Sequence, residues 1–79
     1  MFYTYVLRSV QTGRRYVGSC EDVEERLRRH NAGHSQSTRH GAPWVLLWCE
    51  EFMTRGEAME KERYYKTGRG REELDRRPR

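Results

Sequence analysis

The chain has 79 residues, room for one domain spanning positions 1–79. A chain this short buries only about 60% of the surface that it exposes when unfolded, so its core is expected to be thin. Its hydrophobic share is 34%, but five tyrosines, two tryptophans and two phenylalanines each bury a large area. The composition therefore predicts a folded domain with charged helical edges and excludes a disordered chain.

The charge is basic, with 16 lysines and arginines against 12 acids and a formal net charge of +4. Lys61 and Lys66 are the only lysines. Arginine suits bidentate phosphate contacts better than lysine does, so this bias favours a nucleic-acid partner. A plain basic protein with solvated helix faces is the alternative.

The expected location is the cytoplasm. No apolar run is long enough to span a membrane, and no signal peptide follows Met1. Cys20 and Cys49 form no C-x-x-C pair and are expected to be free thiols in a reducing compartment.

The first elements predict a hairpin. Residues 2–8 and 15–19 are rich in aromatic and β-branched side chains, and Tyr3, Tyr5 and Leu7 share one face of the first run. Residues 10–14 supply a turn centred on Gly13.

A first helix is expected over residues 23–30. Asp22 has the character of an N-cap, and Glu25 completes a capping-box-like pattern three residues later. Asn31 and Gly33 end the helix. Residues 32–42, with glycine, serine and threonine, predict a loop.

The second half predicts one more strand and two helices. Residues 44–49 are continuously apolar, which indicates a strand that is covered on both faces or central in its sheet. Thr54 and Glu57 form a capping-box pattern before a helix over residues 55–66.

Gly68 is expected to end that helix. Gly70 separates it from a short helical segment over residues 71–77, which Pro78 follows. The predicted order is β-β-α-β-α-α, an α+β class.

Several residues carry chemistry. Tyr5 and Tyr16 lie on the paired strands and can present hydroxyls at one surface, although a strand tyrosine is most often packing. Gly18 interrupts its strand, which marks a bulge or the close approach of another group, or else a simple bend.

Arg26 and His30 lie four residues apart on one flank of the first helix, beside its apolar stripe. Arg26 either extends its stem over the core or clamps a phosphate.

Glu62 follows Ala58 and Met59 by one turn and precedes Tyr65, so it projects from the apolar face of the second helix. A carboxylate there costs several kcal/mol unless it is paired or metal-bound. Either it forms a salt bridge with a core-facing arginine, or it holds a cation.

Together these elements resemble the GIY-YIG nuclease family. Tyr3-Thr4-Tyr5 stands at its first motif and Tyr16-Val17-Gly18 at its second, with Arg26 and His30 in register. Glu57 to Glu62, followed by Lys66, is similar to the helix that carries the family's metal-binding glutamate. Asn31 and the tail from Tyr64 to Arg71 look like compact stand-alone bacterial members.

There are departures from the family pattern. The first motif lacks its glycine, and Ser19 stands where the excinuclease subunit carries a lysine.

The resemblance implies a three-stranded antiparallel sheet flanked by helices and a DNA endonuclease, with a role in repair or recombination. It implies one Mg²⁺ or Mn²⁺ ion with Glu62 as the only protein ligand, stabilising the leaving 3′-oxygen. Arg26 would stabilise the scissile phosphate, and Tyr5 would orient or deprotonate the attacking water. Either His30 or a neighbouring cation would manage the proton. The implied catalytic residues are Tyr5, Tyr16, Arg26, His30 and Glu62, and the implied substrate-binding residues are Gly18, Ser19, Arg29, Asn31 and Lys66.

Two other functions compete with this one. The same fold could bind DNA without cutting it, and either activity could involve a partner protein or a homodimer. A metal or redox protein would use the three histidines and two cysteines, but their spacings match no common zinc pattern.

Overall fold

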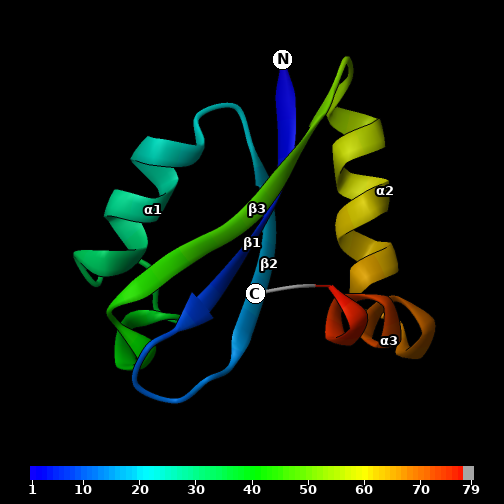
Figure 1. Ribbon diagram of the computed structural model, residues 1–79. Coiled ribbons are helices and arrows are strands. Elements are labelled where there is room, and N and C mark those ends of the chain that lie inside the picture. The colour runs from blue at the N-terminus through cyan, green and yellow to red at the C-terminus, as the bar shows by residue number, and fades with distance from the viewer. Residues whose placement is uncertain (78–79) are drawn as a thin grey trace.

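The computed structural model describes residues 1–77. It contains one antiparallel sheet of three strands in the order β2-β1-β3. Helix α1 lies against one face of the sheet, and α2 and α3 lie against the other (Figure 1). The elements are β1 Phe2–Ser9, β2 Arg15–Cys20, α1 Val23–Asn31, a 3-10 turn η1 Arg39–Gly41, β3 Trp44–Phe52, α2 Arg55–Tyr65 and α3 Gly68–Arg76. This confirms the predicted α+β class and element order. Among the described helices, none is long and apolar enough to cross a membrane.

The predicted hairpin of β1 and β2 is confirmed. Gly13 takes the positive φ of 77° that the turn requires, and its amide donates to the Ser9 carbonyl at 2.9 Å. The resulting register pairs Tyr5 with Gly18, and the residues that flank Tyr5 alternate between the two faces of the sheet.

That alternation divides the core into two small clusters. On the α1 face the buried members are Tyr5, Leu7, Cys20 and Trp44. On the α2 and α3 face they are Val6, Val17, Tyr65 and Leu74. The core is thin, as the length predicts.

Local capping signals determine where α1 and α2 begin. The Asp22 carboxylate accepts from the Glu25 amide at 3.1 Å at the start of α1. At the start of α2, Thr54 and Glu57 form a complete reciprocal capping box.

The prediction for residues 44–49 was wrong about their environment. β3 is an edge strand, because β1 occupies the centre, and it continues to Phe52. Val45 and Leu46 are 42% and 40% exposed. Trp44 and Trp48 pack on opposite faces of the sheet. Because β3 supplies apolar side chains to both faces, its sequence is as continuously apolar as that of a central strand.

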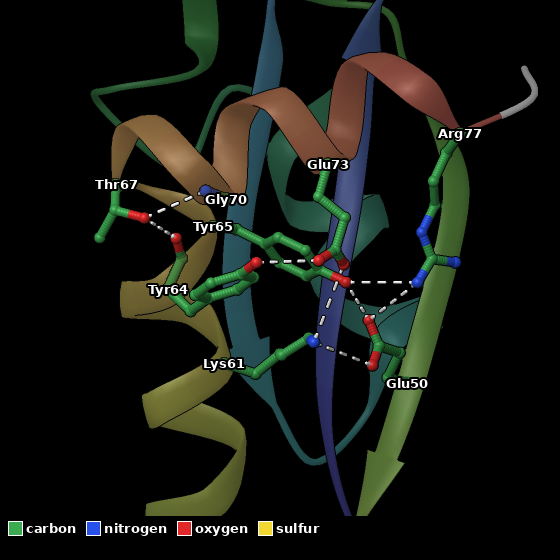
Figure 2. A network of polar contacts seen from close by, with 8 residues as sticks. All are labelled: Glu50, Lys61, Tyr64, Tyr65, Thr67, Gly70, Glu73 and Arg77. Atoms are coloured by element: carbon green, nitrogen blue, oxygen red, sulfur yellow. Dashed lines mark hydrogen bonds and ion pairs between the residues drawn. The ribbon is translucent and has the colours of Figure 1, made fainter.

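The boundary between α2 and α3 also differs from the prediction. α2 ends at Tyr65 and α3 begins at Gly68, because the Thr67 hydroxyl accepts the Gly70 amide at 3.1 Å and caps the new helix (Figure 2). Gly70 is a contact point inside α3: a Cβ there would lie 2.6 Å from the Tyr64 carbonyl carbon. Pro78 lies outside the described residues.

Candidate active site

At Gly18 the buried ring of Tyr5 lies directly against the backbone of the edge strand β2. A Cβ at Gly18 would lie 2.6 Å from Tyr5 Cζ and nearer still to its hydroxyl oxygen. Only a residue without a side chain leaves room for the Tyr5 ring at this paired position. The predicted close approach is confirmed, and the approaching group is Tyr5 itself.

The Tyr5 hydroxyl starts a chain of buried polar groups. It lies 3.1 Å from His30 Nε2, and His30 Nδ1 lies 2.6 Å from Thr38 Oγ1. The three residues are 1%, 2% and 1% exposed. The indole of Trp44 donates to the Thr38 carbonyl at 2.8 Å and holds the loop in place. These contacts bind β1, α1 and the loop after α1 into one unit.

Thr38 was not predicted as a site residue, because it lies in a segment expected to be an ordinary loop. One general signal was available. A histidine on the buried flank of a helix needs a partner for each ring nitrogen, and serine or threonine hydroxyls in the following loop are the nearest candidates. That signal identifies the kind of partner but not the position.

Burial and Arg26 set the charge states of this chain. Burial lowers the pKa of His30 below its ordinary value, and the Arg26 guanidinium lowers it further. Burial, and secondly the neighbouring Tyr16, raises the pKa of Tyr5 far above 10, although Arg26 opposes this. Both groups are therefore neutral near pH 7.

Tyr16 lies between this buried chain and the solvent. Its ring centroid is 4.8 Å from that of His30 and 6.3 Å from that of Tyr5. The two tyrosines therefore share one face of the sheet, as predicted. However, Tyr5 is buried, so Tyr16 presents the more accessible ring of the pair.

A hollow of about 250 Å³ opens beside Tyr16. Its lining residues are Tyr16, Arg26, Arg29, His30, His34 and Ser35. Two guanidinium groups in one small hollow make it suited to an anion such as phosphate. Arg26 borders both this hollow and the Tyr5 hydroxyl.

Glu62 occupies the opposite side of β2. Its Oε1 accepts the Ser19 hydroxyl at 2.8 Å, and its Oε2 pairs with Lys66 Nζ at 2.9 Å. The side chain is 25% exposed, and Met59 is 43% exposed. Glu62 projects beside the buried face of α2, which runs through Ala58 and Tyr65, so its carboxylate is partly buried. The pairing partner is a lysine one turn away, not a core-facing arginine.

The two halves of the site meet at the free edge of β2. Gly18 and Ser19 are consecutive, so their side-chain directions point to opposite faces of the sheet. Gly18 contacts Tyr5 on the α1 side, and Ser19 binds Glu62 on the α2 side. The Tyr5 phenol and the Glu62 carboxylate therefore flank the edge strand at adjacent positions.

Asn31, predicted to bind substrate, lies apart from this arrangement. Asn31 accepts the Trp44 amide at 2.6 Å and donates to the Trp44 carbonyl at 3.1 Å, so its polar atoms tie α1 to β3. Arg29 reaches the hollow and also pairs with Glu25 at 3.3 Å.

The histidines and cysteines do not gather. Among residues 1–77, no three or more His, Cys, Asp or Glu side chains are grouped as a metal site would require. Cys20 is buried and Cys49 is exposed, and both are free thiols.

Comparison with known families identifies this fold as that of a nuclease-type domain. The profile of the GIY-YIG catalytic domain matches residues 1–75. The chain therefore belongs to the GIY-YIG catalytic domain family, whose nucleases generally use a divalent metal ion.

More particular similarity is to proteins named UPF0213. The one from Bacillus licheniformis is 42% identical over 81% of this chain, and the chain spans 66% of that relative's length. The one from Streptococcus agalactiae serotype V is 40% identical over 81% of this chain and 73% of its own. The solution NMR structure of the UPF0213 protein from Bacillus halodurans is 32% identical, with a TM-score of 0.55 over 94% of this chain and 82% of that one.

Proposed function

We propose that this protein is a divalent-metal-dependent DNA endonuclease that hydrolyses phosphodiester bonds at the free edge of β2. The observation that supports this most strongly is the buried Tyr5–His30–Thr38 chain, which adjoins the arginine-lined hollow beside Tyr16. A linked set of neutral proton carriers beside an anion site is what hydrolysis of a phosphate ester needs.

The first step is activation of the attacking water. A phenol whose pKa lies far above 10 is a poor base unless its own proton can leave. His30 is neutral, and with Nδ1–H donating to Thr38 its Nε2 is free to accept from Tyr5. As the water O–H bond breaks, its proton goes to the Tyr5 oxygen while the Tyr5 proton goes to His30 Nε2. The oxygen of that water bonds to phosphorus as the P–O3′ bond breaks, and the leaving 3′-oxygen takes a proton from a solvent water.

Arg26 carries the scissile phosphate. Its guanidinium lines the hollow and lies beside the Tyr5 hydroxyl, so a phosphate bound there is next to the group that handles the water proton. Developing negative charge on the phosphate oxygens is stabilised by this fixed cation. Tyr16, which lines the same hollow, contacts the phosphate or the water.

Glu62 fits the role of the single protein ligand to Mg²⁺ or Mn²⁺. A carboxylate offers the hard oxygen donors that these ions prefer, and such ions keep several waters. The side chain is one-quarter exposed, and its partner Lys66 is half-exposed and can move away from Oε2. When bound, the ion supplies charge stabilisation for the leaving 3′-oxygen.

One observation favours the alternative of a DNA-binding module without cleavage. The Lys66–Glu62 ion pair already neutralises the carboxylate, so a cation must compete with an ammonium group on the same helix.

A nicking assay separates the two functions. Purified protein is incubated with flap, junction, duplex and single-stranded DNA, with and without Mg²⁺ or Mn²⁺. We expect metal-dependent cutting that falls by about 100-fold or more in Glu62→Gln and in Arg26→Ala. Glu60→Gln and Arg28→Ala are the matched controls, because both side chains are exposed on the same helices.

The outcomes are distinct. Undiminished cutting by Glu62→Gln would exclude the metal role, and DNA binding without cutting in either metal would establish the binding module instead.

A further inference from the structure

A larger groove of about 510 Å³ lies on the other side of Tyr16. It runs between β2, the end of α2 and the start of α3, and its lining residues are Arg14, Arg15, Tyr16, Val17, Tyr65, Lys66, Arg71 and Leu74. Four of these are cations, which come from the hairpin turn and β2, from the residue after α2, and from α3. We propose that this groove binds the phosphate backbone of a nucleic-acid strand beyond the scissile phosphate, an inference that rests on the proposed function.

The charges of the groove are unequally compensated. Arg15 pairs with Asp75 and Lys66 with Glu62. Within residues 1–77, Arg14 and Arg71 form no ion pair at 4.0 Å or less, and both are exposed. Two guanidinium groups therefore stand on opposite walls of the groove with their donors available to an anion.

The groove adjoins the candidate active site at the edge strand β2. Tyr16 lines both the smaller hollow and the groove. Lys66 lines the groove and pairs with Glu62 at 2.9 Å. A strand whose scissile phosphate lies at Arg26 thus passes Tyr16 and Glu62 before it meets the second set of cations.

The groove wall that α3 supplies is held from the far side. Figure 2 shows polar contacts that join α3 to α2 and β3: Tyr64 donates to Glu73 at 2.9 Å, and Lys61 lies 4.0 Å from both Glu50 and Glu73. Arg77 pairs with Glu50 at 3.7 Å, and its guanidinium carbon lies 4.5 Å from the centre of the Trp48 ring.

These contacts lie toward β3, whereas the groove lies against β2. They also include the Tyr65 hydroxyl, which donates to Glu50. Because α3 is already fixed in this way, Arg71 does not have to be ordered when a strand binds, and the free energy of binding is not reduced by that ordering cost.

The lining favours a nucleic-acid strand over an acidic peptide. Val17 and Leu74 also line the groove, but both are buried, so the groove offers little apolar surface to the side chains of a peptide. Arginines at the rim match the regular phosphates of a backbone. Contacts to the phosphate backbone carry no sequence information, so binding through this groove is expected to be independent of sequence.

The test measures binding without cleavage. Fluorescence anisotropy with labelled single-stranded and duplex oligonucleotides is followed over a range of NaCl in EDTA, for the Arg14→Gln/Arg71→Gln double variant. Loss of two phosphate contacts should lower the slope of log K against log[NaCl] by about 1.4 on single strands and about 1.8 on duplex. The dissociation constant should rise several-fold at low salt.

The Arg28→Gln/Arg76→Gln double variant is the matched control. It removes the same charge from α1 and α3, at residues 70% and 78% exposed that do not line the groove. Its slope should stay that of the original protein, and urea unfolding of both variants shows that they fold.

Equal slopes for the two double variants would overturn the groove assignment. So would competition by polyglutamate as effective as that of an oligonucleotide of equal charge. Because no metal is present, a protein that binds through the groove but never cuts refutes only the proposed nuclease function.

Discussion

The Gly18→Ala substitution tests whether the edge strand is shaped around the Tyr5 phenol. The new Cβ would lie 2.6 Å from Tyr5 Cζ and 3.1 Å from Cε1, closer still to the hydroxyl oxygen. Carbon atoms prefer separations of about 3.5 Å or more, so the ring must move by roughly 0.9 Å. The ring is 1% exposed and bonded to His30, so it has no open space to enter.

The size of the effect follows from these contacts. Overpacking of a core costs about 1 to 3 kcal/mol, and loss of the Tyr5–His30 hydrogen bond adds about 0.5 to 1.5 kcal/mol. We therefore expect Gly18→Ala to lower the free energy of unfolding by about 1.5 to 4.5 kcal/mol, a large part of the stability of a small domain.

Urea unfolding measures this cost and its origin. Gly56→Ala is the control, because nothing lies within 4 Å of a Cβ there, and it should be neutral or stabilise by up to about 1 kcal/mol. In a Tyr5→Phe background the nearest clashing atom is gone, so Gly18→Ala should cost at least about 1 kcal/mol less. An unchanged stability in Gly18→Ala, or an equal cost in both backgrounds, would show that β2 is not shaped around the Tyr5 ring.

Two further predictions concern stability. Because the folded-state pKa of His30 is below its unfolded value of about 6.5, the unfolded chain binds more protons between these two pH values. The free energy of unfolding should therefore fall as pH drops below 6.5, by at most about 1.4 kcal/mol per pH unit from this group. Urea unfolding from pH 7.5 to 5 should show a shallower fall in His30→Gln than in the exposed control His40→Gln. Parallel curves for the two variants would contradict the lowered pKa of His30. Gly70→Ala should be strongly destabilising in thermal unfolding, because its Cβ would lie 2.6 Å from the carbonyl carbon of Tyr64. A Cβ at Gly68 meets nothing within 4 Å, so Gly68→Ala should be tolerated. Equal effects of the two substitutions would show that α2 and α3 can move apart with little loss of stability.

Local signals in the sequence were sufficient for most of the fold. The turn at Gly13 and the caps at Asp22 and Thr54 depend on residues within a few positions of each other, so they could be recognised without knowing the tertiary structure. The start of α3 was missed although its signal is also local. Thr67 is an ordinary N-cap, but the glycines around it suggested a break.

Long-range arrangement was not accessible in the same way. The edge position of β3 depends on which strand β1 accepts on its second side, and an apolar run does not encode that choice. The pairing of Asn31 with Trp44 depends on where the loop after α1 returns to the sheet. Motif order brought together Tyr5, Tyr16 and His30, but it did not reveal that Tyr5 is buried.

The buried polar groups of this core are of two kinds, and the difference bears on function. Thr4 donates to the Ala58 carbonyl at 2.6 Å and Ser9 to the Gly41 carbonyl, so each fastens one element to another through the backbone. The Tyr5–His30–Thr38 chain instead links side chains to one another, which is the least common kind of hydrogen bond in proteins.

Apolar side chains of the same shape could fill that space at little cost in stability, since replacing both partners of a buried hydrogen bond is often nearly neutral. A thin core gains little from placing a phenol, an imidazole and a hydroxyl in series. Departures from the local rules of packing concentrate at functional sites. This supports the proposed role of the chain in proton transfer, because Arg26 beside it is the residue proposed to hold the phosphate.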